Sequence, residues 1–258
     1  MVGAIAGDII GSVYEYQRIK SKKFPLFRPE CDCTDDTVLT VAVAQAILTD
    51  GNYRKAVLAF GRRYPEAGYG GRFGVWLHSR NPKPYNSYGN GSAMRASPVG
   101  FAFDTVDDVL REAARSAKFT HNHPEGIKGA QAAALAVFLA RTERSKDLIR
   151  SEIAARFGYD LDRTVDEIRP SYGFDETCQR TVPEAIVAFL GSTSYEDAVR
   201  NAVSLGGDSD TVACITGGIA EAFYGPVPPR VRAKVRKVLT RELWEITERF
   251  CDRYGLAG

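Results

Sequence analysis

The sequence has no marked excess of charge of either sign. Its 34 basic and 32 acidic residues leave a formal net charge of only +2. Proteins that attract nucleic acid electrostatically carry a basic patch and a clear basic excess. Nucleic acid is therefore not indicated as a partner.

Long apolar runs are also missing. No stretch reaches the roughly 18 residues that a membrane-spanning helix needs. The first residues carry no basic segment and include Asp8, which is unlike a secretory signal peptide. We expect a cytoplasmic protein that does not bind membranes, and a monomer is the simplest oligomeric state.

Cysteine is scarce and the cysteines do not form a recognisable set. The chain has five, at positions 31, 33, 178, 214 and 251. Scattered cysteines in odd number are typical of free thiols in a reducing compartment. A zinc site built on Cys31 and Cys33 would need two more soft ligands at finger-like spacing, and none follows.

Alternating strand patterns are nearly absent, and helical periodicity dominates. Apolar or small residues predict buried helices over residues 37–48, 126–140 and 212–223, and another that begins at Pro183. We expect amphipathic helices over 106–117, 148–157 and 195–205, one last helix carrying a core stripe from Val235 to Phe250, and long loops over 68–92 and 160–176. With no linker or repeat, the 258 residues predict a single compact all-α domain.

Two short acidic clusters are the most informative feature. The first reads Thr34, Asp35, Asp36, Thr37, and the second, after two glycines, reads Asp208, Ser209, Asp210, Thr211. Each precedes an apolar, helix-like run. Either cluster alone could simply cap a helix, because Asp, Ser and Thr are preferred N-cap residues. A cap needs only one acid, however, and each cluster has two.

Bringing four carboxylates together is costly without compensating charge. A like-charged pair ~4 Å apart repels by roughly 4 kcal/mol at an effective dielectric of about 20. Two divalent cations would balance the charge, and hard carboxylate and hydroxyl oxygens favour magnesium, manganese or calcium over zinc. The clusters therefore predict a binuclear hard-metal site.

A third acidic pair lies near the N-terminus. Asp8 and Glu15 are seven residues apart, so on a helix both point to the same side, two turns apart. Glycines at positions 3, 7 and 11 form another stripe that a neighbour or ligand could approach. Asp8 could be only a capping acid on a buried helix. Glu15, between two tyrosines, has an environment that can raise a carboxyl pKa and suit proton transfer.

Two loops could bind an anion. Residues 87–95 are rich in glycine and open onto a helix start, which makes an anion cradle or merely a tight turn, and Ser92 could cap that helix. Residues 120–124 hold two of the three histidines, with Pro124 opening the next helix. Neither loop is specific without the rest.

Five motifs in order resemble the ADP-ribosylglycohydrolase family: GDIIGSVYE, TDDT, YGNGSAMR, THNHP and GGDSDT. That family includes the dinitrogenase reductase-activating glycohydrolases of bacteria and the vertebrate ADP-ribosyl-acceptor hydrolases. The resemblance spans nearly the whole chain. It implies an all-α fold with two Mg²⁺ ions (Mn²⁺ in some members) at the base of an ADP-ribose cleft.

The resemblance also implies roles for individual residues. It places the metal ligands at Thr34, Asp35, Asp36, Asp208, Asp210 and Thr211. It places a loop for the diphosphate and adenosine-side ribose at Tyr88, Gly89, Asn90, Gly91, Ser92 and Met94, and a histidine near the phosphates at His121. Glu15 falls near the scissile bond, and we expect Glu15 or Asp36 to take a proton from the attacking water.

The implied reaction is hydrolysis of the bond between ADP-ribose and an acceptor, which releases free ADP-ribose. The partner would be an ADP-ribosylated protein or a small ADP-ribosyl conjugate. Arginine-linked, serine-linked and nucleic-acid-linked ADP-ribose and O-acetyl-ADP-ribose remain open as substrates. Trp76, His78 and Arg80 could shape the acceptor side or simply pack their loop.

Two other functions compete with this one. Residues 208–212 also fit the D-x-D-x-[TV] pattern of haloacid-dehalogenase-type phosphatases, but that fold places the motif at the end of a hydrophobic strand, and here a helix end precedes it. A non-catalytic ADP-ribose-binding protein would not need such a complete set of acids.

Overall fold

The computed structural model describes residues 1–256, and their regular structure is almost entirely α-helical. The helices are α1 (Val2–Tyr16), α2 (Asp35–Leu48), α3 (Tyr53–Arg63), α4 (Gly71–His78), α5 (Ser97–Ala102), α6 (Val106–Lys118), α7 (Pro124–Thr142), α8 (Lys146–Phe157), α9 (Val165–Ile168), α10 (Cys178–Leu190), α11 (Tyr195–Val203), α12 (Ser209–Tyr224), α13 (Pro229–Val238) and α14 (Arg241–Arg253). Two short 3₁₀ turns, η1 (Asn90–Ser92) and η2 (Met94–Ala96), lie in the glycine-rich loop. These residues form no β-strand, so the all-α prediction is confirmed.

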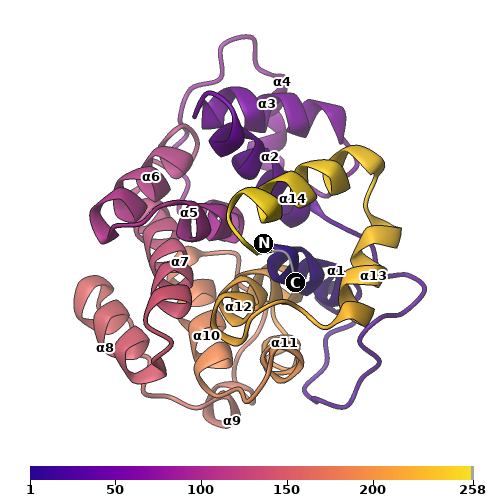
Figure 1. Ribbon diagram of the computed structural model, residues 1–258, viewed down its shortest axis with the longest axis vertical. Helices are drawn as coiled ribbons and strands as arrows, with labels where there is room; N and C mark the ends of the chain where they lie inside the picture. Colours follow the sequence, from indigo (N-terminus) through magenta and orange to yellow (C-terminus); the bar gives the residue numbers. More distant parts are fainter. Residues whose placement is uncertain (257–258) are drawn as a thin grey trace.

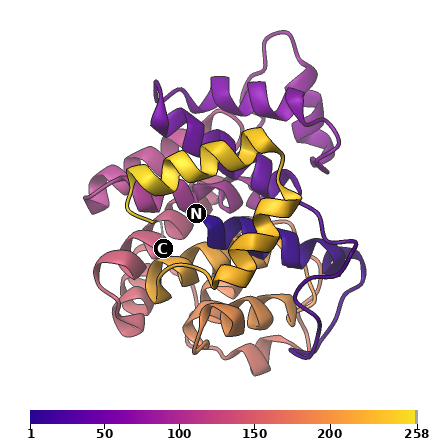
Figure 2. The same cartoon turned by 45° about the vertical axis from the view of Figure 1, so that its right-hand side comes forward.

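Helices α1 and α12 lie at the centre of the molecule (Figure 1). Every residue of α12 from Ser209 to Ala222 is buried, because most of its side chains are small or apolar. Helices α7, α10 and α11 pack against α12, and α2 and α13 pack against α1. The turned view shows α13 and α14 crossing the face of the molecule where α1 begins (Figure 2).

Backbone contact joins α1 to α12. A Cβ atom added at Gly7 would lie 2.0 Å from the carbonyl oxygen of Ala213, and one at Gly11 would lie 2.4 Å from that of Ser209. Gly3 meets Gly217 in the same way, at 2.5 Å. The glycine stripe of the sequence therefore admits a neighbouring helix, and only glycine lets the two backbones come so close.

Several predicted helices are confirmed within about three residues at each end, but four expectations about the elements are wrong. The last helix is two helices, because the hydroxyl of Thr240 accepts from the amide of Leu243 and starts α14 anew. Pro183 lies inside α10 rather than opening it; the helix begins at Cys178, whose amide donates to the carbonyl of Tyr88.

The two long loops each contain a short helix that the sequence analysis missed. In the first, Phe73, Trp76 and Leu77 bury one face of α4. In the second, Thr164 and Glu167 form a reciprocal capping box at the start of α9.

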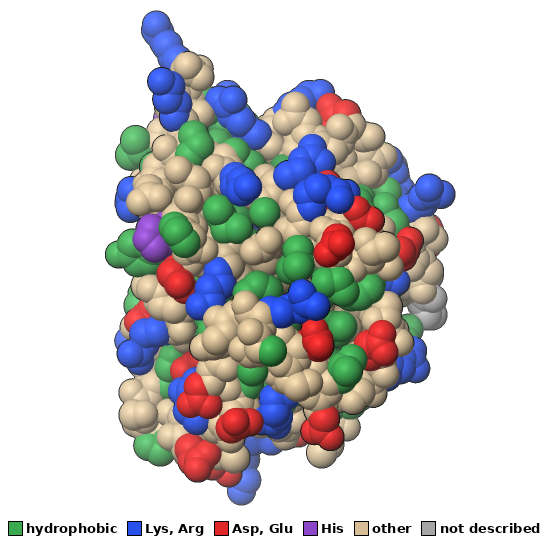
Figure 3. Space-filling model, turned by 90° about the vertical axis from the view of Figure 1, so that its left-hand side faces the viewer, with side chains coloured by type: hydrophobic (Ala, Val, Ile, Leu, Met, Phe, Trp, Pro, Cys, Tyr) green, Lys and Arg blue, Asp and Glu red, His purple; other side chains and the backbone are tan. Residues whose placement is uncertain are grey.

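No helix among residues 1–256 is both long and apolar enough to cross a membrane. The face shown in Figure 3 mixes basic, acidic and apolar side chains without a field of one sign, in keeping with the net charge of +2.

The backbone contact predicts opposite outcomes for two glycine-to-alanine changes. Gly7→Ala forces α1 and α12 apart, and we expect it to lower the free energy of unfolding by about 3 kcal/mol or more. Gly74→Ala, in α4, meets nothing within 4 Å, so it should be neutral or stabilise by up to about 1 kcal/mol. Urea denaturation of both variants measures the difference, and equal effects would contradict the contact.

Candidate active site

One cleft collects most of the residues singled out in the sequence. It has a volume of about 850 Å³. Its lining comes from the end of α1, the start of α2, the glycine-rich loop and the start of α12, and includes Glu15, Thr34, Asp35, Asp36, Gly89, Asn90, Gly91, Met94, His121, Asp208, Asp210 and Thr211. Segments far apart in the chain thus meet around one space.

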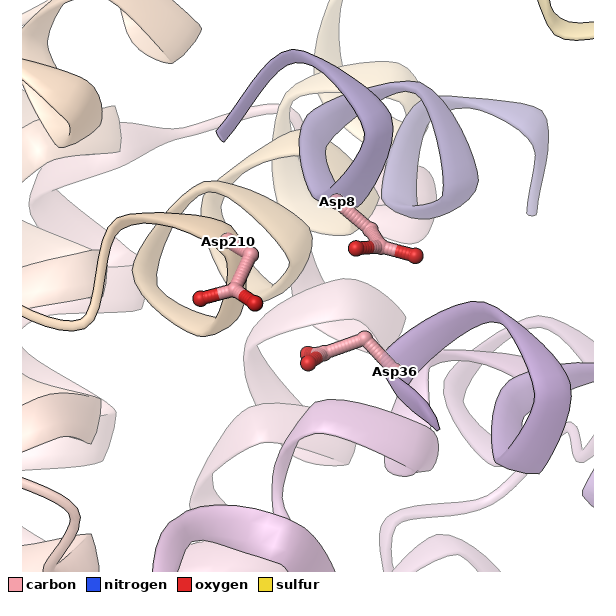
Figure 4. Close-up of side chains that lie close together, drawn as sticks. All are labelled: Asp8, Asp36 and Asp210. Atoms are coloured by element: carbon pink, nitrogen blue, oxygen red, sulfur yellow. The ribbon is translucent and has the colours of Figure 1, made fainter. Parts of the chain in front are cut away.

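Three carboxylates converge where two of them, Asp36 and Asp210, line this cleft. Asp8 of α1, Asp36 of α2 and Asp210 of α12 point toward one another (Figure 4). Each offers one oxygen, and these oxygens lie within 4.8 Å of each other. A second group, formed by Glu15, Asp208 and Asp210, meets the same limit. Asp210 belongs to both groups, so the acids form two adjoining sites.

Asp8 connects the N-terminal helix to the first acidic cluster. Its carboxylate accepts from the amide and hydroxyl of Thr34, at 3.0 and 2.8 Å, and from the amide of Thr37 at 3.1 Å. The Thr37 hydroxyl donates to it as well. These four donors favour the charged form, yet burial dominates and raises the Asp8 pKa to about 6.

Asp36 is the one of these three carboxylates that has a fully buried oxygen without a partner within residues 1–256. Its side chain is 1% exposed. One oxygen, Oδ2, accepts from the Thr211 hydroxyl at 3.1 Å, whereas Oδ1 is buried with no hydrogen-bond partner among the residues described. Buried acceptors are rarely left unpaired. An oxygen of this kind, on a carboxylate that converges with two others, fits a bound cation.

Several carboxyl groups of the cluster have raised pKa values, because they are buried and close to one another. Burial raises the pKa of Asp35, Asp36 and Asp210 well above the ordinary value, and the neighbouring carboxylates raise it further. The same two causes, burial and then the charge of Asp208, raise the pKa of Glu15. Tyr16 does not provide an apolar cover for Glu15, since it is 83% exposed.

Helix capping explains only part of the two clusters. The Thr34 hydroxyl does accept from the Asp36 amide at 3.3 Å, so Thr34 is a true N-cap. Asp208 occupies the N-cap position of α12 but its side chain caps nothing. It accepts instead from the side-chain amide of Asn90 at 2.7 Å.

The glycine-rich loop reaches the acidic cluster through that bond. Asn90 also donates to the Thr181 hydroxyl at 3.0 Å, so its amide fixes the loop between α10 and Asp208. Ser92 does not cap a helix; its hydroxyl donates to the Gly126 carbonyl at 2.7 Å and lies outside the cleft lining. Tyr88 is 44% exposed and packs edge-on against His123, also outside the lining.

Some site residues were not identified from the sequence. For Asp8 the sequence left two interpretations open, a capping acid on its own buried helix or a functional acid. The structure places it in the carboxylate group, where it also accepts from the Thr37 amide in the first turn of α2. Its seven-residue spacing from Glu15 was the available signal. Asp35 lines the cleft but belongs to neither group of converging oxygens.

The three residues that the sequence suggested for the acceptor side, Trp76, His78 and Arg80, do not line the cleft. Trp76 is buried in α4, and the ring of His78 bonds the carbonyl of Gly74. Arg72 and Phe73 of the same segment line the cleft instead.

The fold also removes one competing function. Asp208 and Asp210 stand at the start of a helix that follows another helix, and residues 1–256 contain no strand. A haloacid-dehalogenase-type phosphatase requires a strand at this point, so that interpretation is wrong.

Comparisons with known proteins identify the family to which a chain with this fold and this acidic site belongs. The family description ADP-ribosylglycohydrolase matches residues 1–258. ADP-ribosylhydrolase ARH3 of Mus musculus is 29% identical over 87% of this chain and 82% of its own length. ADP-ribosylarginine hydrolase Tri1 of Pseudomonas putida is 25% identical over 98% of this chain and 77% of its own.

A solved structure described as an ADP-ribosylglycohydrolase-related protein complex shares the fold. It superposes with a TM-score of 0.68 at 24% identity, over 92% of this chain and 94% of that one. Together with the family match along the whole sequence, this shows that the chain belongs to the ADP-ribosylglycohydrolase family and is an ADP-ribosyl hydrolase enzyme.

Proposed function

We propose that this enzyme is a divalent-metal-dependent hydrolase that cleaves the glycosidic bond between ADP-ribose and an acceptor. The unpaired, buried Oδ1 of Asp36, set among further carboxylates, is the observation that carries the metal dependence. The names of the relatives, ADP-ribosylhydrolase and ADP-ribosylarginine hydrolase, support the substrate class.

The donor set fits two hard cations. Asp8, Asp36 and Asp210 would hold one, Asp208 and Asp210 the other, and all the ligand atoms are carboxylate oxygens. Mg²⁺ or Mn²⁺ suits such oxygens. Bound there, the ions would offset the carboxylate charge, bind hydroxyl groups of the ribose and acidify a nearby water. Thr34, Asp35 and Thr211, which the resemblance also assigns, adjoin these groups at the cleft.

We assign the general base to Glu15 rather than Asp36. Asp36 is enclosed at the base of the cleft, whereas Glu15 is half-buried at the end of α1, where water and substrate can reach it. Its raised pKa brings it closer to the working pH of a proton acceptor.

The reaction then balances simply. The oxygen of a water forms a bond to the anomeric carbon, and the bond from that carbon to the acceptor heteroatom breaks. Glu15 takes the water's proton and returns one to the leaving acceptor. Positive charge develops on the ribose in the transition state, and the surrounding carboxylates favour it.

A panel of defined linkages tests the proposal. Purified protein with Mg²⁺ or Mn²⁺ is incubated with arginine-linked, serine-linked and nucleic-acid-linked ADP-ribose and with O-acetyl-ADP-ribose. We expect release of free ADP-ribose from at least one substrate, abolished by EDTA. Tight binding of ADP-ribose without turnover of any linkage would favour a non-catalytic role instead.

Replacing the unpaired acid should remove metal binding. We expect Asp36→Asn to weaken Mn²⁺ binding, measured by calorimetry, by at least about tenfold and to reduce hydrolysis by about 100-fold. Asp147→Asn is the matched control, since Asp147 also lies in the first turn of a helix but is exposed on α8. Equal metal affinity in both variants would disprove the assignment of Asp36.

The raised carboxyl pKa values predict an unusual pH dependence of stability. A carboxyl whose pKa is higher in the folded than in the unfolded protein binds more protons when folded. The free energy of unfolding therefore falls as the pH rises from the unfolded pKa to the folded pKa. The Asp8 pKa is about 6, and those of Asp35, Asp36 and Asp210 are raised too. In EDTA, we expect the Tm to rise as pH falls from about 7.5 to about 5.5.

His121 opposes this trend, because its pKa is lowered, but four carboxyls outweigh one imidazole. With saturating Mg²⁺ the trend should reverse, since cations compete with protons for the same oxygens. Scanning calorimetry at several pH values measures both curves. A Tm that falls steadily with acid in EDTA would contradict the carboxylate repulsion.

A further inference from the structure

Three buried polar side chains form a chain beside the glycine-rich loop. Arg95, Thr120 and His121 are 0%, 0% and 4% exposed. Arg95 Nη2 donates to the Thr120 hydroxyl at 2.9 Å and to the Ser116 carbonyl at 3.1 Å. The Thr120 hydroxyl lies 2.7 Å from Nδ1 of His121.

The guanidinium fixes the direction of the first bond in this chain. A guanidinium can only donate, so the Thr120 oxygen accepts from Arg95. The hydroxyl then has one proton to give, and His121 Nδ1 at 2.7 Å is nearer than the Ala117 carbonyl at 3.3 Å. If Nδ1 accepts this proton, a neutral imidazole must carry its own hydrogen on Nε2.

The surroundings keep the ring neutral. The charges that act on the ring are those of the guanidiniums of Arg95 and Arg72, and no carboxylate among residues 1–256 is hydrogen-bonded to it. Burial and these two cations hold the pKa of His121 well below its usual range. Tyr85 packs against the ring, with the centroids 6.1 Å apart.

The free nitrogen faces the turn of the loop. A Cβ atom added at Gly91 would lie 3.4 Å from Nε2, and one at Gly89 would lie 3.7 Å from it. Nε2 has no hydrogen-bond partner among the described residues, and His121 lines the cleft. With hydrogen on Nε2, His121 would offer the cleft a hydrogen-bond donor that no protein group in the described residues accepts. The carboxylate group, by contrast, offers only acceptors.

We propose that Thr120 and Arg95 are positioning residues that hold His121 in the Nε2–H tautomer, so that its ring donates to the diphosphate of ADP-ribose at the Gly89–Gly91 turn. This inference rests on the proposed function. In the other tautomer, a lone pair would face the phosphate oxygens and the hydrogen bond would be lost.

Arg95 has a second effect in the same place. Its Nε and Nη1 are buried without hydrogen-bond partners in the part of the chain described, and its guanidinium lies over the Phe119 ring, 5.0 Å from the ring centroid. Burial lowers the Arg95 pKa to about 10, so the group stays charged at neutral pH. A dianionic ligand would therefore meet a fixed donor with a buried cation behind it.

Long-range ¹H–¹⁵N correlation on the free protein tests the tautomer directly. The chain has only 3 histidines, and the others serve as references. His78 Nδ1 faces a carbonyl at 2.8 Å and must carry hydrogen, whereas His123 Nδ1 accepts from the Glu125 amide at 3.1 Å. We expect His121 to show the neutral Nε2–H pattern down to about pH 5, below the ordinary histidine pKa of about 6.5. An Nδ1–H pattern, or an imidazolium at neutral pH, would overturn the proposal.

Two variants of Thr120 test the link to the ligand. Thr120→Val removes the hydroxyl, and we expect it to mix the tautomers and weaken ADP-ribose binding about tenfold by calorimetry. Thr120→Ser keeps the hydroxyl and should restore both the spectrum and the affinity to within about twofold. Adenosine, which has no phosphate, should bind all three proteins equally.

The outcomes separate this inference from the proposed function. An unchanged ADP-ribose affinity in Thr120→Val, or an equal loss of adenosine binding, would overturn the positioning role. A wild-type protein that binds no ADP-ribose would overturn the proposed function, while the spectrum of the free protein still decides the tautomer.

Discussion

The backbone contact between α1 and α12 is the constraint on which the site depends. Because glycines of α1 face backbone carbonyls of α12, no side chain separates the two helices there. Asp8 and Asp210, on neighbouring turns, are therefore brought close enough for their oxygens to share a site. Asp8 then accepts from the first turn of α2 and fixes Asp36 opposite. One packing feature thus positions carboxylates from three helices.

That arrangement conflicts with the stability of the isolated chain. Buried carboxylates that face one another are normally neutralised or paired, and here the hydroxyls of Thr34, Thr37 and Thr211 satisfy only part of the set. The large apolar core formed by α1, α2, α7, α10 and α12 maintains the fold in spite of this repulsion. Local conflict of this kind is expected at functional sites.

The cleft is electrostatically divided, and the division suits the proposed substrate. Its base is rich in carboxylates, which cations and a developing positive charge on ribose would favour. The side formed by His121 and Arg95 offers donors and positive charge, which suits a diphosphate. Asn90 spans the two parts, since its amide bonds Asp208 while its backbone forms the glycine-rich turn. A ligand that is a sugar at one end and an anion in the middle would use both.

The sequence by itself determined the helical class, most helix positions and the motifs at the cleft, because periodicity, caps and short acidic clusters are local properties. Tertiary structure alone decided which acids meet. Asp8 joined the carboxylate group and Asp35 did not, since both outcomes depend on how α1, α2 and α12 cross. The contact between Arg95 and Thr120 was likewise hidden, because these residues are 25 positions apart and only folding brings them together.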